Sequence, residues 1–268
     1  KLENVIAGVF KVAEKLYGLQ FEEVFDIDKY HADVKTYRIY DENRNLVSLF
    51  YADFHPRSGK RGGAWMTSFK SNTVYPGLSG TSVYWDFVEL PSQILENWCY
   101  EKEALELFAT HYENGAIIPM ELVQKIKDSA TFQEGMQTLR QLSFGLLDMA
   151  WHGSDPTQIT DVKAQENKAF IGTELYPESP ETCMSTSFSH IFQGGYSSGY
   201  YSYKWAEVLD ADAFAYFKEK GIFDKEVATK FKDNILSKGG TENPMELYKK
   251  FRGAAPKIEP LLERAGLL

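Results

Sequence analysis

Apolar residues recur at helical spacing near the start of the chain. Between residues 3 and 17 they fall at Val5, Ile6, Val9, Phe10, Val12, Ala13 and Leu16. This period places them on one face of a helix. Gly18 is suited to end that helix, because glycine readily adopts the left-handed conformation of a helix C-terminus. The pattern predicts an amphipathic helix over residues 3–17.

Beyond this helix the pattern changes toward alternation. Residues 34–40 and 46–53 alternate and are rich in Val, Tyr and Phe, with a polar turn between them, which predicts a β-hairpin. Residues 65–69 predict a third strand, so a small antiparallel β-sheet is expected within residues 34–69. The basic, glycine-rich loop 57–63 lacks the Ser or Thr that follows Lys in a P-loop, and it is interpreted as a hairpin turn.

The rest of the chain has the pattern of helices joined by turns. Helices are predicted at residues 91–112, 119–127, 131–149, 161–170, 200–217, 225–236, 245–251 and 258–265. Residues 172–189 contain two prolines and many Ser and Thr, which is typical of a loop. The expected fold class is therefore mainly α, with a helical region over residues 75–268 beside the small antiparallel β-sheet.

The stretch 75–98 combines turn residues with a helix that carries two acids. After a glycine-rich turn, a helix is expected to begin near Ser82 and to kink or restart at Pro91, because proline disrupts a helix interior. Asp86 and Glu89 lie three residues apart and so project from one face of the same turn. Such a pair can hold a cation, although ordinary solvated carboxylates near a helix N-terminus have the same spacing.

A second unusual stretch begins at His190 and has the sequence HIFQGGYSSGYYSYKW. Its glycines allow close approach of the backbone, and a tyrosine hydroxyl can donate a hydrogen bond to an oxygen that gains negative charge. The residues alone favour core packing for a turn so rich in tyrosine.

Four segments together resemble one enzyme family. SGTSVYWDFVELPSQILENW, HIFQGGYSSGYYSYKW, GKRGGAW and YKKFRG are similar to the zinc peptidases of the thimet oligopeptidase and peptidyl-dipeptidase (dipeptidyl carboxypeptidase, oligopeptidase A) family. The resemblance covers essentially the whole chain. It implies a zincin-like oligopeptidase catalytic domain, mainly helical, that uses zinc to hydrolyse short peptides.

The resemblance also implies roles for single residues. Glu89 matches the family's third protein ligand to zinc, His190 its transition-state donor and Tyr203 its catalytic tyrosine. Asp86 is a candidate to support the metal ligand. The substrate-gripping loop is matched by Gly194, Gly195, Tyr196 and Tyr200. A shared site requires Glu89, His190 and Tyr203 to face one cavity, although more than a hundred residues separate Glu89 from the other two.

One part of the family pattern is missing. These enzymes need an HExxH helix, whose two histidines bind zinc and whose Glu acts as general base. The chain has no His-Glu dipeptide, and its five histidines never lie four positions apart. Several tens of residues are therefore expected to be missing between Asn72 and Thr73. Three explanations stay open: a segment left out of the sequence, a deletion, or a natural pseudoenzyme that lacks the segment. His111 and His152 are interpreted as residues at helix C-termini, where a cationic His favours the dipole.

Length, composition and charge restrict the remaining choices. With 268 residues, of which 43% are hydrophobic, the chain can form one large or two modest domains. It has no apolar run of bilayer length and no signal peptide. It begins at Lys1 without Met, and full-length members of the family that it resembles carry a long helical region before this point. The resemblance therefore implies that the chain is the C-terminal catalytic portion of a longer protein. The net charge of −9 argues against nucleic acid and anionic membranes as partners. Cys99 and Cys183 predict reduced thiols in a reducing compartment.

Two functions remain open. The first is a zinc peptidase for short peptides, expected to be cytoplasmic and, as the complete enzyme, monomeric. The second is an inactive peptide-binding scaffold with the same channel and tyrosine loop but no metal. The chain as written favours the scaffold, because one carboxylate without paired histidines cannot build a three-ligand zinc site. The whole-chain resemblance favours the peptidase as the biological origin.

Overall fold

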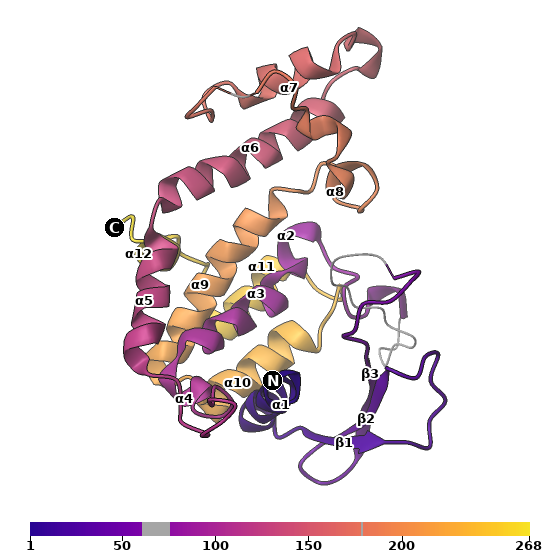
Figure 1. Cartoon of the computed structure of the whole chain (residues 1–268), viewed down its shortest axis with the longest axis vertical. Coiled ribbons are helices and arrows are strands. Elements are labelled where there is room, and N and C mark those ends of the chain that lie inside the picture. Colours follow the sequence, from indigo (N-terminus) through magenta and orange to yellow (C-terminus); the bar gives the residue numbers. More distant parts are fainter. Residues whose placement is uncertain (61–75, 178) are drawn as a thin grey trace.

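The computed structural model describes residues 1–60, 76–177 and 179–268, and Figure 1 shows a helical body with a small sheet at one side. The strand predicted at residues 65–69 and the discontinuity expected between Asn72 and Thr73 lie outside the described residues.

The sheet has three antiparallel strands in the order β1-β2-β3. They are β1 Gln20–Val24, β2 Lys35–Tyr40 and β3 Leu46–Ala52. The predicted hairpin of β2 and β3 is confirmed, with Tyr37 opposite Phe50. Asp41 closes its polar turn by accepting hydrogen bonds from the backbone N–H groups of Asn43 and Asn45.

Strand β1 is absent from the sequence-based prediction, so the sheet begins at Gln20 and not at residue 34. Its sequence, QFEEV, breaks the alternation because Glu22 and Glu23 are consecutive. Both acids pair with bases near the neighbouring strand, Glu22 with Arg44 at 3.0 Å and Glu23 with Lys35 at 3.3 Å. Pairing with β2 therefore stabilises a strand that its own pattern does not indicate.

The helical body confirms the prediction of a mainly α fold. Its first helix, α1 Leu2–Tyr17, ends at Gly18 with φ 70°, the left-handed cap that the sequence predicts. The other α-helices are α2 Trp85–Val88, α3 Leu90–Glu96, α4 Lys102–Leu105, α5 Met120–Thr131, α6 Glu134–His152, α7 Val162–Phe170, α8 Ser189–Phe192, α9 Ser202–Lys220, α10 Lys225–Phe231, α11 Pro244–Arg252 and α12 Glu259–Arg264. A π-helical turn, Lys232–Leu236, extends α10.

The single helix predicted over residues 91–112 is wrong. Helix α3 ends at Glu96, and the chain turns repeatedly before α5. The side chains at the break make tertiary hydrogen bonds: Asn97 Nδ2 donates to a carboxylate of α9, and Trp98 Nε1 donates to a backbone carbonyl beyond α9, each at 3.0 Å. These contacts outweigh the local helical pattern. His111 consequently lies in a turn and not at a helix C-terminus, as its backbone N–H bonds across that turn.

Helix α9 is the centre of the helical body, and α2, α3, α10 and α12 pack against it (Figure 1). The largest buried cluster includes Phe217, Phe231, Tyr248 and Phe251. The Tyr248 hydroxyl also donates to Asp212 Oδ2 at 2.7 Å, and Arg252 pairs with the same carboxylate at 3.3 Å. The YKKFRG segment is therefore part of the core that supports α9.

Candidate active site

Glu89 lies at the junction of α2 and α3. Helix α2 begins at Trp85, three residues later than predicted, and α3 restarts with Pro91 in its first turn, as predicted. Phe87 and Leu90, on either side of Glu89, are buried in the core cluster that includes α9. The sequence thus fixes the backbone of Glu89 by burying its apolar neighbours, while the Glu89 side chain stays partly accessible.

The Glu89 carboxylate has partners from two parts of the chain. The Tyr196 hydroxyl donates to Oε1 at 2.6 Å, and the Ser92 hydroxyl donates to Oε2 at 2.8 Å. Tyr196 lies 107 positions along the chain from Glu89, so the hydrogen bond joins the two sequence segments that carry the resemblance. Both partners donate, which fits a carboxylate that is ionised and accepts only.

His190 and three tyrosines form one cluster of rings beside Glu89. Tyr196 stacks on Tyr203 with ring centroids 4.9 Å apart, and Tyr200 lies 5.2 Å from Tyr203. The centroid of the His190 ring lies 6.3 Å from that of the Tyr203 ring. Tyr196 thus links Glu89 to His190 and Tyr203, so the three residues lie in one region. The expectation that all three face one cavity stays a prediction, because Glu89 is not among the described residues that line the cavity at His190 and Tyr203. The catalytic and ligand roles of these residues stay predictions.

The two adjacent glycines shape the turn that carries Tyr196. Gly195 has φ 87°, a conformation that favours glycine. A Cβ on Gly194 would lie 2.9 Å from both the Cα and the carbonyl oxygen of His190, so a side chain does not fit there. The same tight turn lets the Tyr196 N–H donate to the His190 carbonyl at 3.1 Å. Gly194 and Gly195 thus bring the aromatic rings together.

Asp86 is placed apart from this cluster. It lines a second cavity of about 300 Å³, on the side of α9 that carries Trp205 and Leu209. Within the described part of the chain, no hydrogen bond joins Asp86 to Glu89 or Tyr196. Because α2 ends at Val88, the three-residue spacing does not set the two carboxylates side by side as it would within one continuous helix.

A buried carboxylate on α6, absent from the predicted site, holds the tyrosine turn. Asp148 is 1% exposed, and its two oxygens accept hydrogen bonds from the backbone N–H groups of Ser198 and Tyr200, each at 2.9 Å. His152 Nδ1, one helical turn later, donates to Asp148 Oδ1 at 2.7 Å. The available signal was an acid among apolar residues, in LLDMAWH, with a histidine four positions later. His152 lies at the end of α6, as predicted.

A second buried carboxylate supports the segment that leads into α8. Glu166 on α7 is fully buried and accepts hydrogen bonds from Lys163 and from the N–H and hydroxyl of Ser185. Burial alone would raise its pKa, but the hydrogen bonds from Ser185, Lys163 and the Met184 N–H together lower the pKa to about 2. The charged form of Glu166 is therefore stabilised by folding.

This lowered pKa predicts a pH-dependent contribution to stability. Since the folded-state pKa of Glu166 lies below its unfolded value, the contribution is complete above about pH 5 and is lost as pH falls toward 2. Between pH 5 and 2.5 the wild type loses this contribution from its unfolding free energy. Over the same range we expect the unfolding free energy of Glu166→Gln to fall by about 2 to 3 kcal/mol less than that of wild type. Chemical denaturation at several pH values measures it. Glu174→Gln, at an exposed position of the same region, is the control, and identical pH curves for wild type and Glu166→Gln would contradict the prediction.

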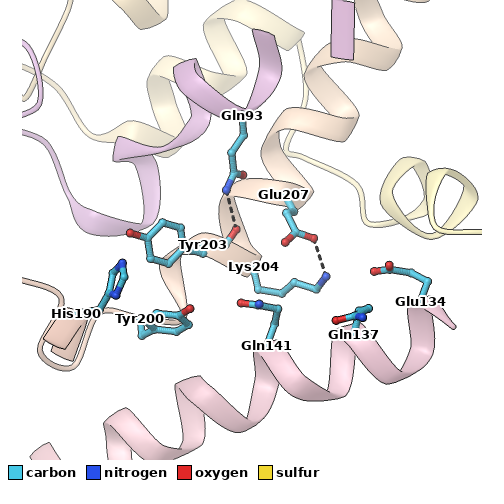
Figure 2. A pocket seen from close by; sticks show the side chains of 9 residues that line it. All are labelled: Gln93, Glu134, Gln137, Gln141, His190, Tyr200, Tyr203, Lys204 and Glu207. Carbon is cyan, nitrogen blue, oxygen red and sulfur yellow. Dashed lines mark hydrogen bonds and ion pairs between the residues drawn. The ribbon is translucent and has the colours of Figure 1, made fainter. Parts of the chain in front are cut away.

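A polar cavity of about 460 Å³ adjoins the aromatic cluster (Figure 2). It lies between α3, α6 and α9 and is lined by Gln93, Glu134, Gln137, Gln141, His190, Tyr200, Tyr203, Lys204 and Glu207. His190, Tyr200 and Tyr203 occupy one end of it in Figure 2, and Glu134 occupies the other. The site thus joins hydrogen-bond donors suited to a developing oxyanion with a polar space for a ligand.

Residues 1–74 and 66–267 match Peptidase family M3. The chain belongs to this family. Oligopeptidase A of Escherichia coli (strain K12) is 37% identical over 323 residues, which cover 98% of this chain and 47% of that protein. Dipeptidyl carboxypeptidase of the same organism is 36% identical over 311 residues, with 97% and 46% covered. An Arabidopsis thaliana protein, "Organellar oligopeptidase A, chloroplastic/mitochondrial", is 35% identical over 333 residues, with 100% and 42% covered.

Two features of these matches bear on the organisation of this M3 chain. It spans about half the length of the relatives it matches. The two ranges that match the family overlap at residues 66–74, and the aligned spans of 311 to 333 residues exceed the 268 residues of the chain. Part of each relative within the aligned span therefore has no counterpart here.

The described residues of this M3 chain do not by themselves form a zinc site. Across residues 1–60, 76–177 and 179–268, no group of three or more His, Cys, Asp or Glu side chains is placed to hold a metal ion. Zinc in enzymes takes three protein ligands, and Glu89 alone offers one carboxylate, which two hydroxyls already contact. In the same part of the chain, no helix has both the length and the apolar character needed to span a membrane.

Proposed function

We propose that this chain is the catalytic portion of a zinc-dependent peptidase that hydrolyses short peptides, of the oligopeptidase or dipeptidyl carboxypeptidase type. The observation that carries the proposal is the meeting of Glu89, Tyr196, Tyr203 and His190 beside a polar cavity. The names of the relatives, oligopeptidase A and dipeptidyl carboxypeptidase, support a peptide as substrate.

Zinc is part of the proposal for the complete enzyme only. We propose that Glu89 is one ligand and that two histidines come from an HExxH segment absent between Asn72 and Thr73. Support comes from the family match in two ranges that meet at residues 66–74, and from aligned spans longer than the chain. Asp86 keeps its proposed role near the metal only if the absent segment brings it into contact with Glu89.

The chain's own side chains have roles that follow from their protonation. Burial, followed by the hydrogen bond to Glu89, raises the pKa of Tyr196 well above its usual range, and burial also raises the pKa of Tyr203. Both phenols are therefore neutral donors near pH 7. Tyr203 and His190 donate to the oxygen of the scissile carbonyl as it gains charge. Tyr196, Tyr200 and the turn formed by the two glycines before Tyr196 hold the peptide.

A second candidate is an inactive peptide-binding scaffold. The observation in its favour is that the described residues contain no group of metal ligands, together with the absence of HExxH from the sequence. The cavity and the tyrosine turn would then bind a peptide without cleaving it.

The proposal also covers partners and location. The net charge of −9 supports a short peptide over nucleic acid or an anionic membrane as ligand. Cys99 and Cys183 are free thiols, which fits the cytoplasm, although one plant relative is named as organellar. We propose a monomer for the complete enzyme.

The test uses the full-length protein and its gene sequence across residues 66–74. We expect an HExxH segment there, about one zinc per molecule by metal analysis, and hydrolysis of short peptides that a chelator abolishes. Glu89→Gln should lower the zinc content, whereas Glu96→Gln, at the end of α3, should not. A complete protein that lacks HExxH and binds peptides without cleaving them would replace the peptidase by the scaffold.

A further inference from the structure

The cavity between α3, α6 and α9 has the chemistry of a binding site for a peptide main chain. Three of its lining residues, Gln93, Gln137 and Gln141, carry carboxamides, and the described lining contains no aliphatic side chain. A carboxamide both donates and accepts, as a peptide group does, so a row of them pairs with N–H and C=O groups regardless of the ligand's side chains. The lining is therefore unsuited to an apolar ligand and suited to an extended peptide.

The Gln93 carboxamide has an oxygen without a hydrogen-bond partner among the described residues. Its Nε2 donates to the backbone carbonyl of Tyr203 at 3.4 Å (Figure 2). Its Oε1 is buried, and no group in the described part of the chain donates to it. Buried acceptors are nearly always paired. An N–H of a bound peptide, held beside Tyr203, would supply the missing donor at the end of the cavity where the scissile bond is proposed to lie.

The charges of the cavity point to a cation at its opposite end. Lys204 and Glu207 neutralise each other with Nζ and Oε2 2.6 Å apart. Glu134 accepts only a hydroxyl, from Thr138 at 3.1 Å, and among the described residues no cation pairs with it. The Glu134 carboxylate is thus the acidic group of the lining that no described cation neutralises.

The geometry of α6 sets the length of the bound segment. Gln141 and Glu134 are seven positions apart on the face of α6 that lines the cavity, which is about 10 Å along a helix axis. An extended chain rises about 3.3 Å per residue, so about three peptide residues cover that distance. Figure 2 shows α6 running along the cavity from the His190 end to Glu134.

We propose that this cavity, the carboxamide groove, binds about three residues of an extended peptide by its main chain, and that Glu134 recognises a cationic group at the far end. The groove therefore selects peptides with a basic side chain or a free amino group about three residues from the cleaved bond, and tolerates any side chains between. This inference rests on the proposed peptidase function, which it extends to substrate selection.

The test of charge recognition is a positional scan in the full-length protein. Peptides of equal length carry a single Lys, or its uncharged analogue norleucine, at each position on either side of the cleaved bond. We expect Lys at one position, about the third residue, to raise kcat/KM about fivefold over norleucine. Glu134→Gln should abolish this preference, so that kcat/KM becomes equal for each Lys peptide and its norleucine counterpart. Glu121→Gln, in the first turn of α5 as Glu134 is in that of α6, should keep it.

The test of main-chain binding uses the carboxamides themselves. Gln137→Ala and Gln141→Ala should each raise KM about fivefold for all peptides, with kcat nearly constant. Gln124→Ala on α5, whose carboxamide bonds within its own helix, should leave KM unchanged. Cleavage with no effect of any groove variant would overturn the inference and leave the proposed function standing.

Direct binding separates this inference from the proposed function. If the full-length protein cleaves no peptide, calorimetric titration with the same Lys and norleucine peptides still reports the groove. Weaker binding of the Lys peptide to Glu134→Gln, and not to Glu121→Gln, would support the groove while the peptidase function fails. Equal affinities across all variants would overturn the groove as well.

Discussion

Tyr203→Phe is expected to lower the kcat of the full-length protein about 100-fold and to leave KM nearly unchanged, because it removes one donor to the developing oxyanion. The substitution deletes only the hydroxyl, so the packing of the ring on Tyr196, at 4.9 Å, and on Tyr200, at 5.2 Å, is kept. Steady-state kinetics on a short fluorogenic peptide give both constants.

Tyr201→Phe is the matched control for this change. Tyr201 lies two positions before Tyr203, is 51% exposed and does not line the carboxamide groove. Its loss of a hydroxyl should change kcat less than twofold, as for an exposed group away from the reacting atoms. Wild-type kcat in Tyr203→Phe would show that another group stabilises the oxyanion, with His190 the next residue to test.

Helices with local stop and start signals were the elements best predicted from the sequence. Gly18 ends α1 with φ 70°, as its lack of a side chain suggests. Asp161, directly before α7, accepts a hydrogen bond from the N–H of Ala164, as an N-cap does. These signals act within one turn of helix, so the residues that carry them are sufficient to locate the boundary.

Elements that depend on distant partners were the ones missed. Strand β1 has no alternation of its own and exists through its pairing with β2. The break after α3 follows from the tertiary hydrogen bonds of Asn97 and Trp98, whose partners lie more than a hundred positions away. Propensity describes only the local preference of the chain, and such contacts override it.

In the site, too, local sequence patterns were less informative than contacts between distant residues. Spacing alone suggested that Asp86 and Glu89 act as a pair, yet Asp86 lines the second cavity while Glu89 accepts a hydrogen bond from Tyr196. The family resemblance, and not the local pattern, linked Glu89 to Tyr196, His190 and Tyr203. Neither the local pattern nor the resemblance identified Asp148 as the anchor of the tyrosine turn. Its partners in that turn are the backbone N–H groups of Ser198 and Tyr200, which no side-chain pattern reveals.

Asp148→Asn is expected to lower kcat/KM about 100-fold, although Asp148 does not line the groove, because a shift of about 1 Å in catalytic groups has an effect of that size. Asp148 is a positioning residue. Its carboxylate accepts three hydrogen bonds, from Ser198, Tyr200 and His152. An asparagine of the same size offers one accepting oxygen, and its NH₂ group faces a donor where the second oxygen was.

The loosened turn should be visible apart from activity. In hydrogen exchange, the amides of Ser198 and Tyr200 should lose protection in Asp148→Asn, while the amides in the C-terminal half of α9 keep theirs. Asp210→Asn is the matched control, because Asp210 is also a buried aspartate, but it pairs with Arg264 on α12 and not with the tyrosine turn. It should lower the unfolding free energy and leave exchange in the turn unchanged.

The two readouts together decide whether Asp148 acts through the tyrosine turn. A general loss of stability would increase exchange throughout α9 and lower the melting temperature in both variants. A positioning role predicts faster exchange confined to the turn in Asp148→Asn, with the fall in kcat/KM persisting well below the melting temperature. If the turn exchanges as in wild type while activity still falls, Asp148 acts by some other route and its assignment as the anchor of Tyr200 is wrong.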